Sequence, residues 1–221
     1  MTFSDCTTPG DPKPITPDAL ADVIAARQKS GRLIVAIAGS PGSGKSTFVE
    51  RLRDRLNAAS PGSTDILPMD GFHFDDTVLA ARGDRPRKGA PHTFDVDGLA
   101  VMLDRLRAGG GRDLAVPVFD RAIEIARAGA RIIAASTPII LVEGNYLLLA
   151  DPAWAPLRQR FDMTVMLAVP EAVLEARLTE RWVGYGLEGA ALRDKMQGND
   201  LPNMRLVLEK SVPADFVVAN F

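Results

Sequence analysis

The chain has 221 residues, 46% of them hydrophobic, and a formal net charge of −2. This length and apolar content fit one α/β domain with a sizeable core. The slightly acidic balance argues against a general nucleic-acid binder, which is usually basic.

The N-terminal sequence and the single cysteine bear on location. Cys6 cannot form an internal disulfide, so no oxidising compartment is implied. The first residues lack the basic and apolar regions of a signal peptide. The most apolar stretch, residues 132–149, is interrupted by Ser136, Thr137, Pro138 and Glu143, which argues against a transmembrane helix. We therefore expect a cytoplasmic protein.

In chain order, residues 1–15 are expected to form a loose tail rich in Pro, Thr and Asp, and residues 16–221 a single domain. Thr16, Pro17 and Gly31 suit the cap, first turn and end of the first helix. Apolar runs and amphipathic periodicity predict the remaining elements. The predicted strands are 33–39, 64–70, 114–120, 130–136, 138–144, 163–169 and 214–221. The predicted helices are 16–31, 45–59, 95–109 (capped by Asp95), 152–161, 170–186, 189–197 and 203–211. A long polar loop is expected over 71–95.

Strands that alternate with helices predict a mostly parallel sheet covered on both faces. Pro117 points to an edge position for the strand over 114–120, because proline lacks a backbone N–H for a sheet interior.

The segment GSPGSGKST matches the phosphate-binding pattern G-x-x-x-x-G-K-[ST] between a buried strand and an amphipathic helix. Its glycines allow backbone N–H groups to converge on an anion, and the helix N-terminus adds more. Lys45 would reach the β- and γ-phosphates, and Ser46 would ligate Mg²⁺. The alternative is a Gly/Ser-rich turn without a ligand. The predicted nucleotide-binding residues here are Gly39, Ser40, Gly42, Ser43, Gly44, Lys45, Ser46 and Thr47.

Two carboxylates end predicted strands. Asp70 lies where ligands bind in open parallel sheets and could accept the proton of an acceptor hydroxyl. Alternatively, Asp70-Gly71 is an ordinary turn pair. Glu143 closes a buried strand, which suits a role at Mg²⁺, although a solvated strand end is the alternative.

The segment RGDRPRKGAPHTFD carries Arg82, Arg85, Arg87 and Lys88, followed by His92. It is either a shaped substrate loop or a solvated charge run. His73 is one of two histidines and is either a substrate contact or structural. Farther along, Arg177 and Arg181 are one helical turn apart. They could stabilise charge on a transferring phosphoryl group, or pair with nearby glutamates on a helix surface.

Together, GSPGSGKST, MDGFH, RPRKGAPHTFD, PVFDR and IILVEGNYLLL occur in an order that resembles the P-loop kinases that include uridine kinase, phosphoribulokinase and bacterial pantothenate kinase. The resemblance covers roughly residues 30–220. It is strongest to the branch labelled fructose transport system kinase.

The resemblance implies a three-layer α/β/α fold with a helical lid over approximately 177–200. It implies ATP and Mg²⁺ as cofactors, with metal contacts at Ser46 and Glu143. The implied catalytic residues are Asp70, Lys45, Arg177 and Arg181. The residues implied to border the acceptor are Arg85, Lys88, His92, Phe119 and Arg121. Asn199 and Asn203 fall where the nucleotide base is approached.

Two departures disfavour uridine as the acceptor: Phe119 replaces a frequent Tyr, and the lid stretch RWVGYGLEGAALRDKM does not follow the uridine kinase pattern. The favoured hypothesis is an ATP-dependent kinase acting on a hydroxyl of a small polar metabolite, with a sugar such as fructose favoured. A pantothenate or nucleoside kinase is one alternative, and a nucleotide-binding regulator or accessory ATPase is another. We expect no nucleic-acid or membrane partner. A homodimer is compatible with the sequence but not required by it.

Overall fold

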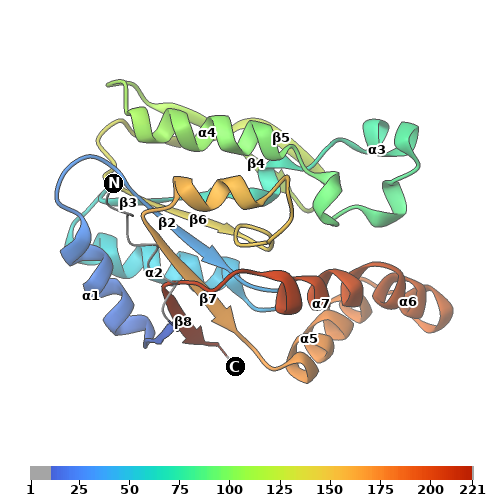
Figure 1. Cartoon of the computed structure of the whole chain (residues 1–221). Coiled ribbons are helices and arrows are strands. Elements are labelled where there is room, and N and C mark those ends of the chain that lie inside the picture. The colour runs from blue at the N-terminus through green and yellow to red at the C-terminus, as the bar shows by residue number, and fades with distance from the viewer. Residues whose placement is uncertain (1–10, 221) are drawn as a thin grey trace, which may run out of the picture.

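A computed structural model describes residues 11–220 of the chain. Its main sheet has six parallel strands in the order β1-β8-β7-β2-β6-β3 (Figure 1). These strands are β1 (Lys13–Pro14), β2 (Leu33–Ala38), β3 (Thr64–Pro68), β6 (Ile139–Gly144), β7 (Met163–Ala168) and β8 (Phe216–Ala219). The central strands β2 and β6 are buried along their whole length, as their continuous apolar runs predict.

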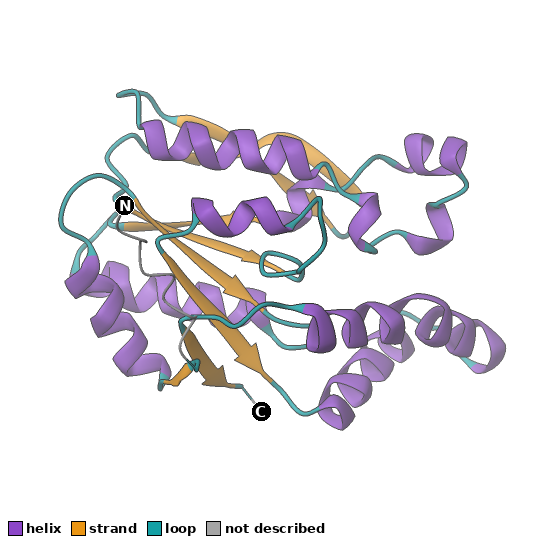
Figure 2. Ribbon diagram, viewed as in Figure 1, coloured by secondary structure: helices purple, strands orange, loops and turns teal. Residues whose placement is uncertain are grey.

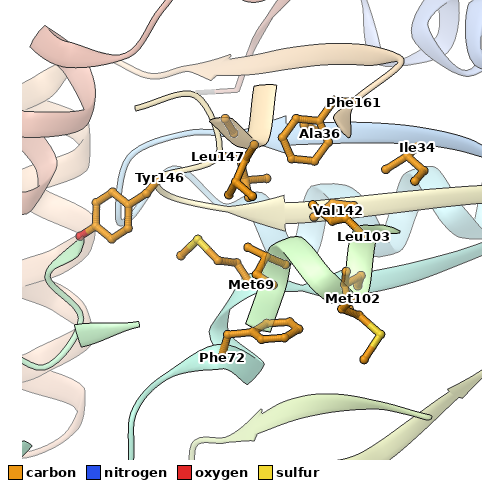
Figure 3. Close-up of a cluster of buried hydrophobic side chains, with 14 of the residues drawn as sticks. Ile34, Ala36, Met69, Phe72, Met102, Leu103, Val142, Tyr146, Leu147 and Phe161 are labelled. Carbon is orange, nitrogen blue, oxygen red and sulfur yellow. The ribbon is translucent and has the colours of Figure 1, made fainter. Parts of the chain in front are cut away.

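Helices cover both faces of the sheet (Figure 2), which confirms the predicted three-layer α/β/α fold. Helices α1 (Pro17–Arg27) and α2 (Lys45–Ala59) pack on one face. Helix α4 (Val96–Ala108), the 3₁₀ helix η4 (Ala155–Arg160) and the C-terminal helix α7 (Leu201–Lys210) contribute to the core on the other face. Figure 3 shows part of that second core, in which Met69, Leu103 and Val142 pack together.

Local capping places the helix starts as predicted. The Thr16 hydroxyl accepts a hydrogen bond from the Ala19 N–H at the start of α1, and the Asp95 carboxylate accepts one from the Gly98 N–H at the start of α4. The end of α1 was predicted less well. The helix stops at Arg27, and Gly31 instead forms the following turn with φ of +69°.

Strands β4 (Leu114–Asp120) and β5 (Ile125–Ile133) form an antiparallel hairpin outside the main sheet. The strand predicted over 130–136 is therefore shifted toward the N-terminus, to Ile125–Ile133. It pairs with β4, so its expected place in the parallel sheet was wrong. β5 is mostly exposed, so it lacks the apolar surface of a strand buried on both faces. The register of the hairpin shifts around Pro117, consistent with the predicted edge character.

The segment from 71 to 95, predicted to be a loop, contains short helices: the end of the 3₁₀ helix η1 (Met69–Phe72), then α3 (Asp76–Arg82), η2 (Arg85–Arg87) and η3 (Pro91–Thr93). In α3, the Asp75 carboxylate accepts from the Thr77 N–H at the start, Leu79 is fully buried, and Gly83 ends the helix at φ of +77°. We call residues 71–95 the acceptor segment.

Four helical pieces follow β7: α5 (Glu171–Gly184), α6 (Gly189–Lys195), the π-helix η5 (Met196–Asp200) and α7. A small separate core joins them, with Leu174, Leu178 and Met204 fully buried. The predicted lid, residues 177–200, corresponds to most of α5 with α6 and η5, and its motion stays a prediction. None of the helices in residues 11–220 is long and apolar enough to cross a membrane.

The predicted loose tail differs from the structure where the structure describes it. Lys13 and Pro14 form β1, paired with Phe216 and Val217 of β8. The prediction therefore fails for these two residues, whereas residues 1–10 lie outside the described part of the chain.

Candidate active site

The glycine-rich turn between β2 and α2 leaves the start of α2 open to an anion. Gly42 and Gly44 adopt φ of +82° and +79°, which a residue with a Cβ rarely adopts. Gly44 caps α2 without any side-chain hydrogen bond, and the first turn of α2 carries no acidic residue. The unpaired N–H groups and the positive helix end therefore remain available for phosphate oxygens.

Lys45 is buried at this turn. Its ammonium donates to the Ser40 carbonyl at 3.0 Å and to the Ser43 hydroxyl at 3.5 Å. Burial lowers the pKa of Lys45 to about 8, although the charges of Glu143 and Asp70 oppose this shift. A bound polyphosphate would supply the missing negative charge, so this residue fits a nucleotide.

Glu143 ends β6 beside the phosphate turn and is buried. Its Oε1 accepts a hydrogen bond from the Ser46 hydroxyl at 3.4 Å. Burial and the charge of Asp70 raise the pKa of Glu143 to about 7. A divalent cation would relieve this cost, and Mg²⁺ commonly takes one carboxylate, a hydroxyl and substrate phosphates rather than a cage of protein ligands. Residues 11–220 contain no group of three or more His, Cys, Asp or Glu side chains that could hold a metal ion.

Close backbone packing positions Asp70. It lies in η1, directly after β3, at the carboxyl end of the sheet. A Cβ on Gly71 would come within 2.4 Å of the Pro117 carbonyl oxygen, and one on Gly144 within 2.6 Å of Met69. Both glycines thus allow η1 to fit between β6 and the β4–β5 hairpin. Gly71 is needed for close approach, not for the positive φ of a turn.

A cleft of about 960 Å³ runs from the phosphate turn to the hairpin. It brings together most of the predicted site residues from the phosphate turn, the acceptor segment, the hairpin and the lid. Those that line it are Gly42, Gly44, Lys45, Ser46, Thr47, Asp70, His73, Arg85, Lys88, Phe119, Arg121, Glu143, Arg181, Asn199 and Asn203. Gly39, Ser40 and Ser43 lie behind the phosphate turn, where they shape it.

Aromatic rings form one wall of the acceptor end. The His73 ring lies 4.0 Å from the Phe94 ring and 4.7 Å from the Phe119 ring, measured between centroids. Its Nδ1 is 2.8 Å from the Asp70 carbonyl oxygen. Burial lowers the pKa of His73, so the ring is neutral at pH 7. His73 therefore supports Phe119 and the backbone of Asp70.

Charges at the acceptor end are paired. Arg121 contacts the Asp70 carboxylate at 2.5 Å, and Lys88 and Arg85 contact Asp76 at 2.6 and 3.0 Å. The Lys88 ammonium also donates to the Glu124 carbonyl at 2.6 Å and lies 5.2 Å from the Phe119 ring centroid. The acceptor end therefore offers three cations and two carboxylates, in contact with one another, beside an aromatic face.

Two further predicted site residues, His92 and Arg177, lie outside the cleft. His92 is half-exposed and lies 3.6 Å from Asp84 on the outer side of the acceptor segment. Arg177 donates to the Asn220 carbonyl at 3.2 Å, and the Asn220 amide in turn donates to the Ser43 carbonyl. Arg177 thus ties the base of α5 to the phosphate turn through Asn220, whereas Arg181 faces the cleft.

Asn199 and Asn203 line the cleft, but both side chains are buried and hydrogen-bonded within the protein. Asn199 donates to the Lys88 carbonyl at 2.9 Å, and Asn203 donates to the Asn199 side-chain oxygen at 3.1 Å. Their amides therefore join the lid to the acceptor segment.

Asp76, Trp182, Tyr185 and Lys195 are among the cleft residues that sequence reasoning missed. Trp182 donates to the Asp200 carboxylate, and the Lys195 ammonium lies 4.7 Å from its ring centroid. The pair of aromatic residues in RWVGYG was a signal, because Tyr185 is exposed and Trp182 is only partly buried against the small core of the lid. Asp76 gave no signal beyond its suitability for a helix start.

Comparisons with known proteins agree with this geometry. A family described as "Phosphoribulokinase / Uridine kinase family" matches residues 34–182. A candidate uridine kinase, C227.14 of Schizosaccharomyces pombe, is 33% identical over 85% of this chain and 83% of its own length. A pantothenate kinase of Parvibaculum lavamentivorans is 30% identical over 74% of this chain, which spans only 52% of that kinase.

One solved structure is similar along nearly the whole chain. It is described as a candidate fructose transport system kinase from Silicibacter sp. TM1040, with 40% identity and a TM-score of 0.85. The similarity covers 92% of this chain and 98% of that one.

Proposed function

The chain belongs to the phosphoribulokinase and uridine kinase family of small-molecule kinases, and from this premise we propose that it transfers the γ-phosphoryl group of ATP to a hydroxyl of a neutral sugar, with fructose favoured. The observation that carries the sugar assignment is that three cations at the acceptor end already contact carboxylates. Arg121 contacts Asp70, and Lys88 and Arg85 share Asp76. An anionic acceptor would have to separate one of these ion pairs.

The aromatic wall supports the same substrate class. Sugars offer apolar C–H faces to aromatic rings and hydroxyls to paired carboxylates and cations, and Phe119 lies beside Asp70, Arg121 and Lys88. Phe119 offers no hydroxyl of its own, so polar recognition comes from the ion pairs. The name of the Silicibacter relative points to fructose, and its 40% identity supports that choice among sugars.

In the proposed reaction, bound MgATP supplies the phosphoryl group and the metal offsets phosphate charge. The Asp70 carboxylate accepts the proton of the acceptor hydroxyl as its oxygen bonds to the γ-phosphorus and the bond to the β-phosphate oxygen breaks, which releases ADP. Lys45 and Arg181 stabilise the charge on the transferring group. Ser46 and Glu143 would hold the metal.

Most of the rate gain comes from positioning and electrostatics, because phosphoryl transfer needs little covalent help from the protein. Arg121 orients the Asp70 carboxylate through their 2.5 Å contact. The neutral His73 ring fixes the backbone of Asp70 and one edge of Phe119. Exclusion of water by the lid limits hydrolysis of ATP.

The test is ADP release with a panel of acceptors at equal concentration: fructose, fructose 6-phosphate, pantothenate, uridine and no acceptor. We expect kcat/KM for fructose to exceed that for its phosphate by about tenfold or more, since the phosphate must break an ion pair. A preference for pantothenate or uridine would refute the sugar assignment. ADP release that no acceptor raises would favour a regulator or accessory ATPase.

A further inference from the structure

Lys88 joins three parts of the acceptor site. Its ammonium contacts Asp76 of α3 at 2.6 Å and the Glu124 carbonyl of the hairpin turn at 2.6 Å, and it lies against the Phe119 ring. The side chain is only 13% exposed. Glu124 adopts φ of +55°, a conformation unusual for a residue with a side chain, and this turns its carbonyl toward Lys88.

The backbone of Lys88 is held from the opposite side of the cleft. Its carbonyl accepts the Asn199 side-chain amide at 2.9 Å. Asn199 lies in the π-helix η5, between α6 and α7, and π-turns inside helices frequently mark functional sites. Figure 1 shows these helices and the acceptor segment on the same side of the molecule.

Further hydrogen bonds fix Asn199 itself. Asn203 donates to the Asn199 side-chain oxygen, which leaves the Asn199 amide aimed at Lys88. Arg87 donates to the Asn203 oxygen at 3.4 Å and to the Gly198 carbonyl. Asn199 and Asn203 are each 3% exposed, and their side chains are hydrogen-bonded to each other and to neighbouring groups. Burying two amide side chains costs free energy, so this arrangement indicates a functional role.

The acceptor segment is also held by a residue outside the lid. The Tyr146 hydroxyl donates to the Gly89 carbonyl at 2.6 Å, and Tyr146 follows Glu143 by three residues (Figure 3). The segment therefore has a fixed support at Tyr146 and further supports at Asn199, Gly198 and Asn203. Of these, Asn199 and Gly198 belong to the predicted lid, so these two contacts can change if the lid moves.

We propose that Asn199 and Lys88 form a clasp by which the lid positions the wall of the acceptor pocket. Asn199 is a positioning residue: it acts through Lys88 and touches neither the nucleotide nor the acceptor. The proposal rests on the proposed function, because it assumes that a nucleotide binds under the lid. Through this clasp, nucleotide binding orders the acceptor segment before an acceptor binds.

The experiment is hydrogen–deuterium exchange of the full chain with and without the non-hydrolysable ATP analogue AMP-PNP and Mg²⁺. In the unmodified protein we expect the analogue to slow exchange both at residues 39–47 and at residues 84–95. In Asn199→Ala, protection at 39–47 should persist and the added protection at 84–95 should disappear. The change at 84–95 should be about fivefold, the effect of one net hydrogen bond.

Asn57→Ala is the matched control, because Asn57 also bridges two elements, through bonds to the backbone of Thr64, but lies away from the cleft. It should keep the response at 84–95. Asn199→Asp is the second variant, since it keeps the volume but replaces the amide donor with an anion facing the Lys88 carbonyl. It should behave as Asn199→Ala, even if the alanine variant folds poorly.

Protection at 84–95 that survives in both Asn199 variants would overturn the clasp, and so would an acceptor segment that never responds in the unmodified protein. Absence of protection at 39–47 in the unmodified protein would refute nucleotide binding and hence the proposed function. The two failures are therefore distinguished by which segment fails to respond.

Discussion

Replacing Asp70 by asparagine should abolish most phosphoryl transfer while leaving the nucleotide site intact. An amide cannot accept the proton of an acceptor hydroxyl, and loss of a positioned base costs about 10²- to 10⁴-fold in rate. At 1.36 kcal/mol per tenfold, this is about 3–5 kcal/mol of lost transition-state stabilisation. We therefore expect kcat to fall by at least about 100-fold.

The structure also limits what else this substitution changes. Arg121, the partner of Asp70, is 58% exposed, so the pair contributes about 1 kcal/mol or less to the free energy of unfolding. Effects on the nucleotide oppose each other. Removing the carboxylate reduces repulsion of the phosphates but also lowers the pKa of Lys45, which the charge of Asp70 raises. Nucleotide affinity should thus change little.

The assay pairs ADP release, which gives kcat, with calorimetric titration of AMP-PNP, which gives Kd. Asp120→Asn is the matched control. Asp120 also pairs with an arginine, Arg127 at 3.1 Å, within the β4–β5 hairpin, but it does not line the cleft. It should keep its activity. Turnover of Asp70→Asn within a few-fold of the unmodified protein would refute the role of Asp70 as base.

Three further predictions follow from buried groups. Lys45→Met keeps the length of the side chain but loses charge-assisted bonds to phosphate, so the calorimetric Kd for AMP-PNP should rise about 10- to 100-fold. Trp154→Ala empties a fully buried site and should lower the free energy of unfolding in urea by about 3–5 kcal/mol. Burial lowers the pKa of His73, so the unfolded chain binds more protons just below pH 6.5. Thermal stability should fall as pH drops below 6.5, and His73→Phe should remove this part of the loss.

The phosphate end of the site could be predicted from sequence because its chemistry is local. A strand, a glycine-rich turn and a helix start lie within fifteen residues, and Gly42, Gly44 and Lys45 act through the backbone and side chains of that one segment. Asp70 was harder, because a turn pair and a catalytic aspartate look alike in sequence. The packing of Gly71 against Pro117 shows that this glycine serves a close approach, and the catalytic role of Asp70 stays a prediction.

The acceptor end could not be predicted as well because its contacts join distant segments. His73 and His92 were both predicted as substrate contacts, yet one is buried beside Asp70 and the other pairs with Asp84 outside the cleft. The hairpin was missed because its strands resembled further members of the parallel sheet. Asn199 meets Lys88 across 111 positions of sequence, a separation that no local pattern reports.

The two ends of the cleft treat positive charge differently, and this bears on turnover. Lys45 is hydrogen-bonded to uncharged oxygens, and Arg181 has no carboxylate partner within residues 11–220; its charge helps to lower the pKa of Lys45. Cations without a direct carboxylate contact attract a polyanion such as a nucleotide. At the acceptor end, Arg121 is already paired with Asp70. A neutral sugar enters without breaking that pair, but its phosphate ester is an anion beside the Asp70 carboxylate. Under the proposed function, the pairing of Arg121 with Asp70 therefore favours both entry of the neutral sugar and release of its anionic product.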